Sequence, residues 1–271
     1  MKLDLEKLTH VPTYIANISF ALGFLAREIR NPILGKIADG QFSDYIIQPG
    51  RYGGAFHSGS FFDVYNLRNP QGEESHVIGF GRHRDGEFSG DTTRFYYYTN
   101  EDYKTLLRYY AADADTRRIP IQYLAYGPDL DGIDTTVFIR EKVDVAKKLV
   151  HIGEYDFIRY PELQDELAGF LAQTKRMKNE SGQLPDIKNP SNVVLTNEGR
   201  MMLLDLNYCI PMVEGTNYGD RLPELPERIV LRNYYSMQRM MSEKISYRKA
   251  YDMECKIEWE HRTRPYRRRV R

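Results

Sequence analysis

Four polar residues lie close together in one short stretch of the sequence, and their types suit the binding of a hard cation and a phosphate. Asp186, Lys188 and Asn192 occupy a loop broken by prolines, and Asp205 follows two apolar runs separated by an Asn-Glu-Gly turn. Apolar runs on either side of a turn predict a β-hairpin, whose two ends meet. Asn192 and Asp205 would therefore lie together. Carboxylate and amide oxygens are ligands that Mg²⁺ accepts while water and phosphate fill the rest of its shell.

The same stretch has a simpler interpretation as an ordinary surface hairpin. Asn, Asp, Gly and Pro favour turns because their backbones and side chains stabilise turn geometry locally. The turn-forming residues alone do not distinguish a cation-binding site from an ordinary surface hairpin.

The spacing of these residues favours the functional interpretation. The stretch 184–207 resembles the catalytic and metal-binding loops of the protein-kinase-like superfamily, which includes eukaryotic-type kinases and aminoglycoside phosphotransferase relatives. In that family an Asp is followed by an Asn, a hairpin and a metal-binding Asp that usually precedes Phe-Gly. Here Asn192 precedes Asp205 by thirteen residues, the spacing expected for the family. The stretch departs from the pattern because Asp186 precedes Asn192 by six positions rather than five, no His-Arg precedes Asp186, and Asn207 replaces the glycine.

The resemblance implies a two-lobed α+β fold, with a small antiparallel-sheet N-lobe and a mainly helical C-lobe. It also implies an ATP- and Mg²⁺-dependent phosphotransferase that acts on a hydroxyl acceptor, either a small molecule or a protein side chain. By the same resemblance, Asp186 orients or deprotonates that hydroxyl with Lys188 beside it, and Asn192 and Asp205 hold Mg²⁺ against the nucleotide phosphates.

A glycine-rich loop lies further upstream, between two strand-like runs at 45–48 and 61–67. Glycine lets the backbone approach a phosphate closely and present N–H donors to it. The loop lacks the Gly-Lys-Ser/Thr of P-loop enzymes. It is therefore either a plain turn or, as the resemblance implies, a cover for the nucleotide phosphates. Its glycines are Gly50, Gly53, Gly54 and Gly59.

The strand predicted at 76–82 lacks the lysine that pairs with nucleotide phosphates in the family. Arg82 is the nearest cation, and a guanidinium binds phosphate with a geometry different from that of an ammonium group. Arg82 either replaces the lysine or simply faces solvent at the strand end. The missing lysine supports an alternative function, a pseudokinase that serves as a binding or scaffold module without phosphoryl transfer.

Apolar periodicity predicts the remaining elements. We expect a helix over 100–114 with Asn100 as its N-cap, and two strands that lead to a hinge between the lobes near 141–143. The other predicted strands and helices are strands 121–126 and 135–141, and helices within 1–38 and over 144–152, 161–177 and 226–244, with a last helix before the C-terminal tail. The predicted domains are an N-terminal helical extension at 1–43, an N-lobe at 44–142, a C-lobe at 143–260 and an Arg-rich tail at 261–271.

The composition is that of a soluble globular protein, with 41% hydrophobic and 28% charged residues among 271. The sequence has no apolar run near the ~20 residues that cross a bilayer. Two cysteines provide neither a disulfide framework nor metal-ligand spacing, so we expect a cytoplasmic protein. The net charge is zero, yet the last eleven residues hold six arginines and no acid. Such a tail is either a solvated end or a site for nucleic acid, an anionic membrane surface or another acidic partner.

Overall fold

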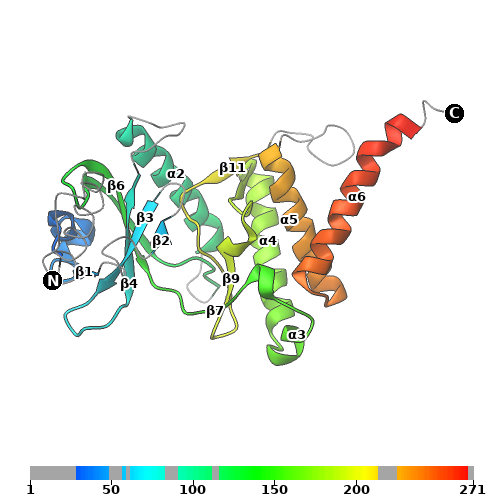
Figure 1. Cartoon of the computed structure of the whole chain (residues 1–271), viewed down its shortest axis with the longest axis horizontal. Helices are drawn as coiled ribbons and strands as arrows, with labels where there is room; N and C mark the ends of the chain where they lie inside the picture. The colour runs from blue at the N-terminus through cyan, green and yellow to red at the C-terminus, as the bar shows by residue number, and fades with distance from the viewer. Residues whose placement is uncertain are drawn as a thin grey trace, which may run out of the picture. The chain divides into compact units, whose positions relative to one another are not determined.

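The structure is a computed structural model that describes residues 29–48, 57–58, 62–82, 91–111, 116–212 and 225–267, without the side chains of 57–58, 225–226 and 261–267. It is an α+β protein with an antiparallel sheet and five α-helices in these ranges. The chain forms two compact units (Figure 1). Unit 1 contains residues 1–97 and 121–142, and unit 2 contains residues 98–120 and 143–271. The boundary between 142 and 143 falls within the stretch where we expected a hinge.

Unit 1 is built on one antiparallel sheet with the strand order β1-β3-β4-β6-β5, and β2 pairs with β3. The predicted strands around 45–48, 61–67, 76–82, 121–126 and 135–141 are all present, within two residues at each end. The strands are β1 Ile46–Gln48, β2 His57–Ser58, β3 Phe62–Arg68, β4 His76–Gly81, β5 Gln122–Pro128 and β6 Asp134–Glu141.

One face of this sheet buries the apolar core of unit 1. The core joins strand residues to the segment that precedes β1, which forms two short 3₁₀ turns at Pro32–Gly35 and Ile37–Gly40. The helix predicted within 1–38 is therefore wrong for residues 29–38. Residues 1–28 lie outside the described residues. Asn31 accounts for the turns, because its Oδ1 accepts from Ile33 N at 2.9 Å and its Nδ2 donates to Asp129 O at 2.8 Å. The core residues are Ile33, Leu34, Ile37, Phe42, Ile47, Leu67, Ile78, Phe80, Val137 and Ile139.

The opposite face of the sheet carries a group of aromatic rings. Phe62 lies 5.0 Å from Phe138 and 5.5 Å from Phe95, measured between ring centroids. Gly79 of β4 makes room for one of these rings, because a Cβ at this position would collide with Phe138. A Cβ at Gly81 would instead lie 2.7 Å from the Thr135 hydroxyl.

Helix α2, Thr92–Tyr110, begins in unit 1 and ends in unit 2. It starts eight residues before the predicted position, so Asn100 lies inside the helix and is not its N-cap. The side chain of Asp91 occupies the place of the cap, since its Oδ1 accepts from Arg94 N at 2.9 Å. The prediction placed the start too late because the Tyr-rich turn after Asp91 does not look amphipathic.

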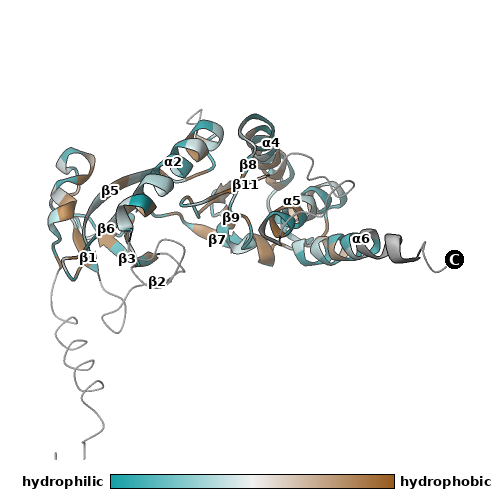
Figure 2. Ribbon diagram, turned by 90° about the horizontal axis from the view of Figure 1, so that it is seen from above, coloured by the Kyte–Doolittle hydropathy of each residue, from teal (hydrophilic) through white to brown (hydrophobic). Residues whose placement is uncertain are grey.

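Unit 2 combines helices with two small sheets (Figure 1). In Figure 2, hydrophobic residues lie along the strands around β9, whereas most of α6 is hydrophilic. Its helices and strands are β7 Val145–Lys148, α3 Asp156–Arg159, α4 Leu163–Ser181, β8 Gln183–Pro185, β9 Val193–Thr196, β10 Met201–Leu203, β11 Cys209–Pro211, α5 Leu225–Glu243 and α6 Tyr247–Arg267. Within the described part of the chain, no helix combines the length and the apolar character of a membrane span.

Two predicted helices of unit 2 need correction. Residues 144–152 do not form an α-helix, because β7 pairs antiparallel with β9 and completes the three-stranded sheet β10-β9-β7, and a 3₁₀ turn follows at Leu149–His151. Pairing with a distant strand overrides the local periodicity here. The helix predicted over 161–177 is present but continues to Ser181, where Gly182 ends it with a left-handed φ of 67°. The helix predicted over 226–244 corresponds to α5.

A buried ion pair joins the hairpin β9–β10 to α4. Arg118, 7% exposed, pairs with Glu166 of α4, and Glu166 Oε2 also accepts from Met201 N at 2.9 Å. The backbone of Arg118 contributes as well, because its carbonyl accepts from Leu203 N at 2.8 Å. Gly169 leaves room for the guanidinium, with which a Cβ at this position would collide. The hairpin is thereby held to α4 and to Arg118 through two backbone N–H groups of β10.

Candidate functional site

The hairpin β9–β10 brings together the polar residues that flank it. Its strands pair in the register Val193↔Leu203, and the turn between them uses a glycine at φ 81°. The pairing extends one step beyond the strands, because Leu204 N donates to Asn192 O at 2.7 Å. Asn192 and Asp205 therefore lie at the same end of the hairpin.

The side chain of Asn192 connects the loop to Asp205. Its Nδ2 lies 3.3 Å from Asp205 Oδ2 and donates to Asp186 O at 3.1 Å. The four polar residues singled out in the sequence are thus in one cluster with Asn207. We call it the acid–amide cluster, and it consists of Asp186, Lys188, Asn192, Asp205 and Asn207.

The carboxylate of Asp205 forms no ion pair with any residue that the structure describes. Its hydrogen bonds are long: Oδ1 accepts from the backbone N and the Nδ2 of Asn207 at 3.3 and 3.4 Å. Two amide oxygens nearby lack donors. Asn207 Oδ1 is buried without a partner, and no described donor contacts Asn192 Oδ1. Here the amide nitrogens of Asn192 and Asn207 face Asp205, so a divalent cation bound at this carboxylate would need the amide oxygens turned toward it.

Asp186 is 7% exposed and faces Lys188. Its Oδ2 lies 3.3 Å from Lys188 Nζ, and its Oδ1 accepts from Lys188 N at 3.1 Å. Burial raises the pKa of the Asp186 carboxyl, and the charge of Asp205 raises it further, while Lys188 opposes both effects. A buried carboxyl with a raised pKa is suited to accepting a proton from a bound hydroxyl.

A buried side chain from α5 fixes the backbone of this loop. Asn233, 1% exposed, donates from Nδ2 to the carbonyls of Ile187 at 2.6 Å and Lys188 at 3.0 Å. Tyr247, at the start of α6, donates from its hydroxyl to Asn233 Oδ1 at 2.8 Å. We call this chain of hydrogen bonds the Asn233–Tyr247 clamp. Sequence reasoning missed it, because the pattern of α5 indicates only an amphipathic helix.

Asp102 on α2 is a second residue that sequence reasoning left aside. Its Oδ2 accepts from Cys209 N at 3.0 Å, four residues after Asp205. Burial raises the pKa of the Asp102 carboxyl to about 6, against the lowering effect of this hydrogen bond. No signal in the sequence marked Asp102, because the predicted helix start at 100 placed it in the first turn, where the helix N-terminus alone satisfies an acid.

The residues predicted in unit 1 are placed differently. Gly50, Gly53, Gly54 and Gly59 lie outside the described residues. Arg82 follows β4, and its Nε lies 3.5 Å from Asp63 Oδ1, with both side chains about one-third exposed. On the face of β4 that carries Gly79 and Gly81, the ring of Phe138 fills the space at Gly79 and the hydroxyl of Thr135 limits the space at Gly81, so neither position has room for a lysine without rearrangement.

Among the described residues, no group of three His, Cys, Asp or Glu side chains is placed to hold a metal ion. A cation at the acid–amide cluster would therefore depend on amide oxygens together with Asp205. A comparison of the chain with protein-family models and with curated protein sequences finds no match to either.

Proposed function

We propose that the chain is an ATP- and Mg²⁺-dependent phosphotransferase of two-lobed, kinase-like fold that acts on a hydroxyl group. The observation that carries the proposal is the carboxylate of Asp205, which lacks a counter-charge in the described parts of the chain and lies beside the amides of Asn192 and Asn207. The side chain of Asp205 is only partly buried, and its hydrogen-bond donors from Asn192 and Asn207 are neutral, so a bound divalent cation would supply the positive charge that these donors do not.

The order of the elements supports the same proposal. Four strands, one of them the two-residue β2, then a helix and two further strands precede the boundary at 142–143, and a long helix, a polar loop and a hairpin follow it. This is the order that the kinase-like resemblance implies. The two compact units would correspond to its two lobes.

Each residue of the cluster has a role in this proposal. Asn192 and Asp205 would hold Mg²⁺, which when bound supplies positive charge to the phosphate oxygens. Asp186 would orient the acceptor hydroxyl and take up its proton, and Lys188 Nζ would contribute a second positive charge beside it. The Asn233–Tyr247 clamp would keep the backbone of this loop in place.

A second candidate function is a pseudokinase, a binding or scaffold module without phosphoryl transfer. It is favoured by β4, which has no lysine and whose Gly79 and Gly81 are closely approached by Phe138 and Thr135 of β6. It is also favoured by the pairing of Arg82 with Asp63, since that arginine already has a carboxylate partner.

The test is the thermal stability of the full chain with ATP and Mg²⁺. Nucleotide at 100 times its Kd should stabilise the fold by about 2.7 kcal/mol. Asp205→Ala should lose the stabilisation, whereas Asp165→Ala, an exposed acid on α4, should keep it. No stabilisation of the wild type at millimolar ATP–Mg²⁺ contradicts both candidate functions. Stabilisation without any turnover of ATP supports the pseudokinase.

A further inference from the structure

The hairpin that connects β5 to β6 ends in an acidic turn that leaves an apolar side chain in water. Ile133 is 52% exposed, and it lies between Asp131 and Asp134, which are exposed as well. Neither of these two acids has an ion-pair partner among the described residues. We call residues 131–134 the acidic tip. It presents one apolar side chain with a negative charge before and after it.

Hydrogen bonds at the base of the acidic tip hold it in one conformation. Asp129 Oδ1 accepts from the backbone N of Asp131 and of Ile133, each at 2.9 Å. The carbonyl of Asp129 accepts from Asn31 Nδ2 at 2.8 Å, and Gly132 closes the turn with a left-handed φ of 81°. A side chain on an ordered turn loses little conformational freedom when a partner covers it. The acidic tip is therefore suited to docking.

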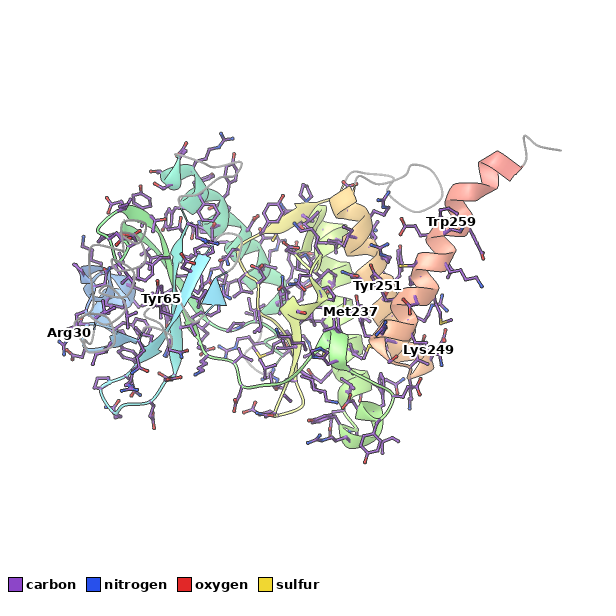
Figure 3. All side chains as sticks on the ribbon, viewed as in Figure 1. Arg30, Tyr65, Met237, Lys249, Tyr251 and Trp259 are labelled. Atoms are coloured by element: carbon purple, nitrogen blue, oxygen red, sulfur yellow. The ribbon has the colours of Figure 1, made fainter. Side chains whose placement is uncertain are left out.

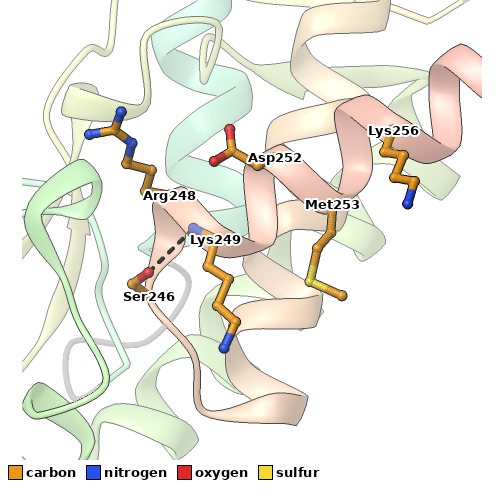
Figure 4. A pocket seen from close by; sticks show the side chains of 6 residues that line it. All are labelled: Ser246, Arg248, Lys249, Asp252, Met253 and Lys256. Carbon is orange, nitrogen blue, oxygen red and sulfur yellow. Dashed lines mark hydrogen bonds between the residues drawn. The ribbon is translucent and has the colours of Figure 1, made fainter.

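Helix α6 of unit 2 carries the opposite pattern of charge. Lys249, Met253 and Lys256 follow one another at steps of four and three, which places them along one side of the helix. Lys249 lies near the start of α6 (Figure 3). The three side chains line a surface groove of about 460 Å³ and extend toward the same side of α6 in Figure 4. We call them the Lys–Met–Lys row. It presents an apolar side chain between two cations.

The positive charge of this row is largely unopposed. Lys256 has no ion-pair partner in the described parts of the chain. Lys249 Nζ lies 3.5 Å from Glu154 Oε1, but both side chains are about 60% exposed, and such a pair contributes little. Arg248 and Asp252 also line the groove, but they have opposite charges and extend away from the row in Figure 4. A carboxylate of a partner could therefore pair with either lysine.

A turn beside the groove leaves two further apolar side chains in water. Tyr155 and Ile158 are 73% and 74% exposed. The turn is nevertheless fixed, because the buried Asp156 accepts from Lys147 Nζ at 2.6 Å. The glutamate that precedes Tyr155 is the partner of Lys249, so the turn borders the groove. A partner bound in the groove would find additional apolar area here.

We propose that the chain associates head to tail, with the acidic tip of one copy bound in the α6 groove of a second copy. Ile133 would contact Met253, while Asp131 and Asp134 would lie beside the two lysines of the row. Opposite charges on the two surfaces speed the encounter and fix the register of docking. The contact joins two different surfaces, so a third copy can add to either end of a pair. The proposal does not depend on phosphotransferase activity.

An anionic membrane surface fits these observations less well. A helix that lies in the membrane interface buries a continuous apolar face. The apolar side of α6 is packed on α5, with Ala250 fully buried, and Met253 stands between two lysines on the groove side. The acidic tip, in contrast, provides both the charge and the apolar side chain that this row lacks.

Sedimentation velocity of the full chain tests the association. The tip is short and the contact area is small, so we expect weak binding, visible between about 10 µM and about 1 mM protein. The average mass should rise with concentration and fall when salt is added. A chain that stays monomeric over this range overturns the proposal. Binding of that monomer to vesicles that contain phosphatidylserine would assign the groove to a membrane instead.

Charge reversal on one surface at a time identifies the contact. The groove variant combines Lys249→Glu with Lys256→Glu, and the tip variant combines Asp131→Lys with Asp134→Lys. Each variant alone should raise the dissociation constant about tenfold or more, because like charges then face each other. An equimolar mixture should form a one-to-one dimer and nothing larger, because only the tip of the groove variant and the groove of the tip variant remain intact.

Formation of this dimer would also show that both variants are folded. A mixture that stays monomeric while the wild type associates overturns the proposal, and so does self-association of either variant at the strength of the wild type. A chain with all four reversals should associate again, since the charges of the two surfaces are then exchanged.

Matched controls change the net charge by the same amount at exposed positions elsewhere. The control for the groove variant is Lys148→Glu with Lys175→Glu, and the control for the tip variant is Asp165→Lys with Glu198→Lys. Both controls should associate like the wild type. If they weaken association as much as the reversals on the tip and the row, net charge is the cause and the proposed contact is wrong.

Discussion

The loop and hairpin at 184–207 and the end of β4 are the two regions from which a phosphate site would be built, and they differ sharply. In unit 2 the acid–amide cluster brings Asp186, Asn192 and Asp205 within hydrogen-bonding reach and is supported from α5. In unit 1 the strand end has an arginine already paired with Asp63, and β4 itself contains no lysine. The residues proposed to hold a cation are therefore held together by hydrogen bonds in unit 2, whereas β4 provides no lysine for the proposed phosphate site.

The largest effect expected from this comparison is on catalysis. Asp205→Asn keeps the shape of the side chain but removes its charge, so the turnover of ATP should fall about a thousandfold or more. Arg82→Gln should reduce turnover much less, because Arg82 lies beside Asp63 rather than in a structured phosphate site. A steady-state assay of phosphate release measures both. If Arg82→Gln is the more damaging change, the functional contrast between the two regions is reversed.

The two regions should also differ in stability. Arg118→Met leaves Glu166 without its partner in a largely buried position, which should lower the free energy of unfolding by about 3 kcal/mol. Arg82→Gln breaks a pair that is about one-third exposed and should cost less than about 1 kcal/mol. Urea denaturation of the two variants gives these values, and similar losses for both would contradict the difference in burial.

Loss of the hydrogen bonds that hold the loop from α5 should lower the free energy of unfolding by a smaller amount. Asn233→Leu removes the donor to the carbonyls of Ile187 and Lys188 and should cost about 2 kcal/mol. Tyr247→Phe removes only the hydrogen bond to Asn233 and should cost about 1 kcal/mol. A Tyr247→Phe variant as unstable as Asn233→Leu would show that the hydroxyl, and not the amide, holds the loop.

The smallest expected effect is the pH dependence due to Asp102. Its folded pKa of about 6 lies above the value of ~3.9 for an unfolded chain, so the folded state binds more protons between these values. The free energy of unfolding should therefore fall as the pH rises from about 4 to about 6, and the loss should persist at neutral pH. Asp102→Asn keeps an acceptor for Cys209 N and should be more stable than the wild type at pH 7 by about 1 kcal/mol, allowing for solvent screening.

Denaturation at several pH values measures this difference, which should vanish below about pH 4. Glu101→Gln, at the exposed neighbouring acid, should be nearly neutral at every pH. A stability gain for Asp102→Asn that does not depend on pH would mean that the carboxyl is not the source of the effect.

The sequence predicted the contacts that local geometry determines. A two-strand hairpin with a short turn must return near its starting point, so the approach of Asn192 to Asp205 followed from the pattern alone. The clamp on the same loop could not be predicted, because Asn233 lies 46 residues from Ile187 and no periodicity marks it. Residues 144–152 were wrongly predicted as a helix because the pairing of β7 with β9 is also a long-range contact, which the local pattern does not show. The packing of Phe138 against Gly79 of β4 could not be predicted either, because Phe138 lies on β6, which follows β4 only after α2 and β5.

The most direct test of the central claim, that Asn192 and Asp205 share a divalent cation, uses Mn²⁺ in place of Mg²⁺. A paramagnetic ion broadens the NMR signals of the groups that bind it, so the side-chain amide of Asn192 is a local probe. On titration with Mn²⁺ and ATP, the Asn192 amide signals should broaden first, and Asp205→Ala should abolish this effect. If the Asn192 signals remain sharp while other regions broaden, the two side chains do not share a cation and the proposed phosphotransferase site is refuted.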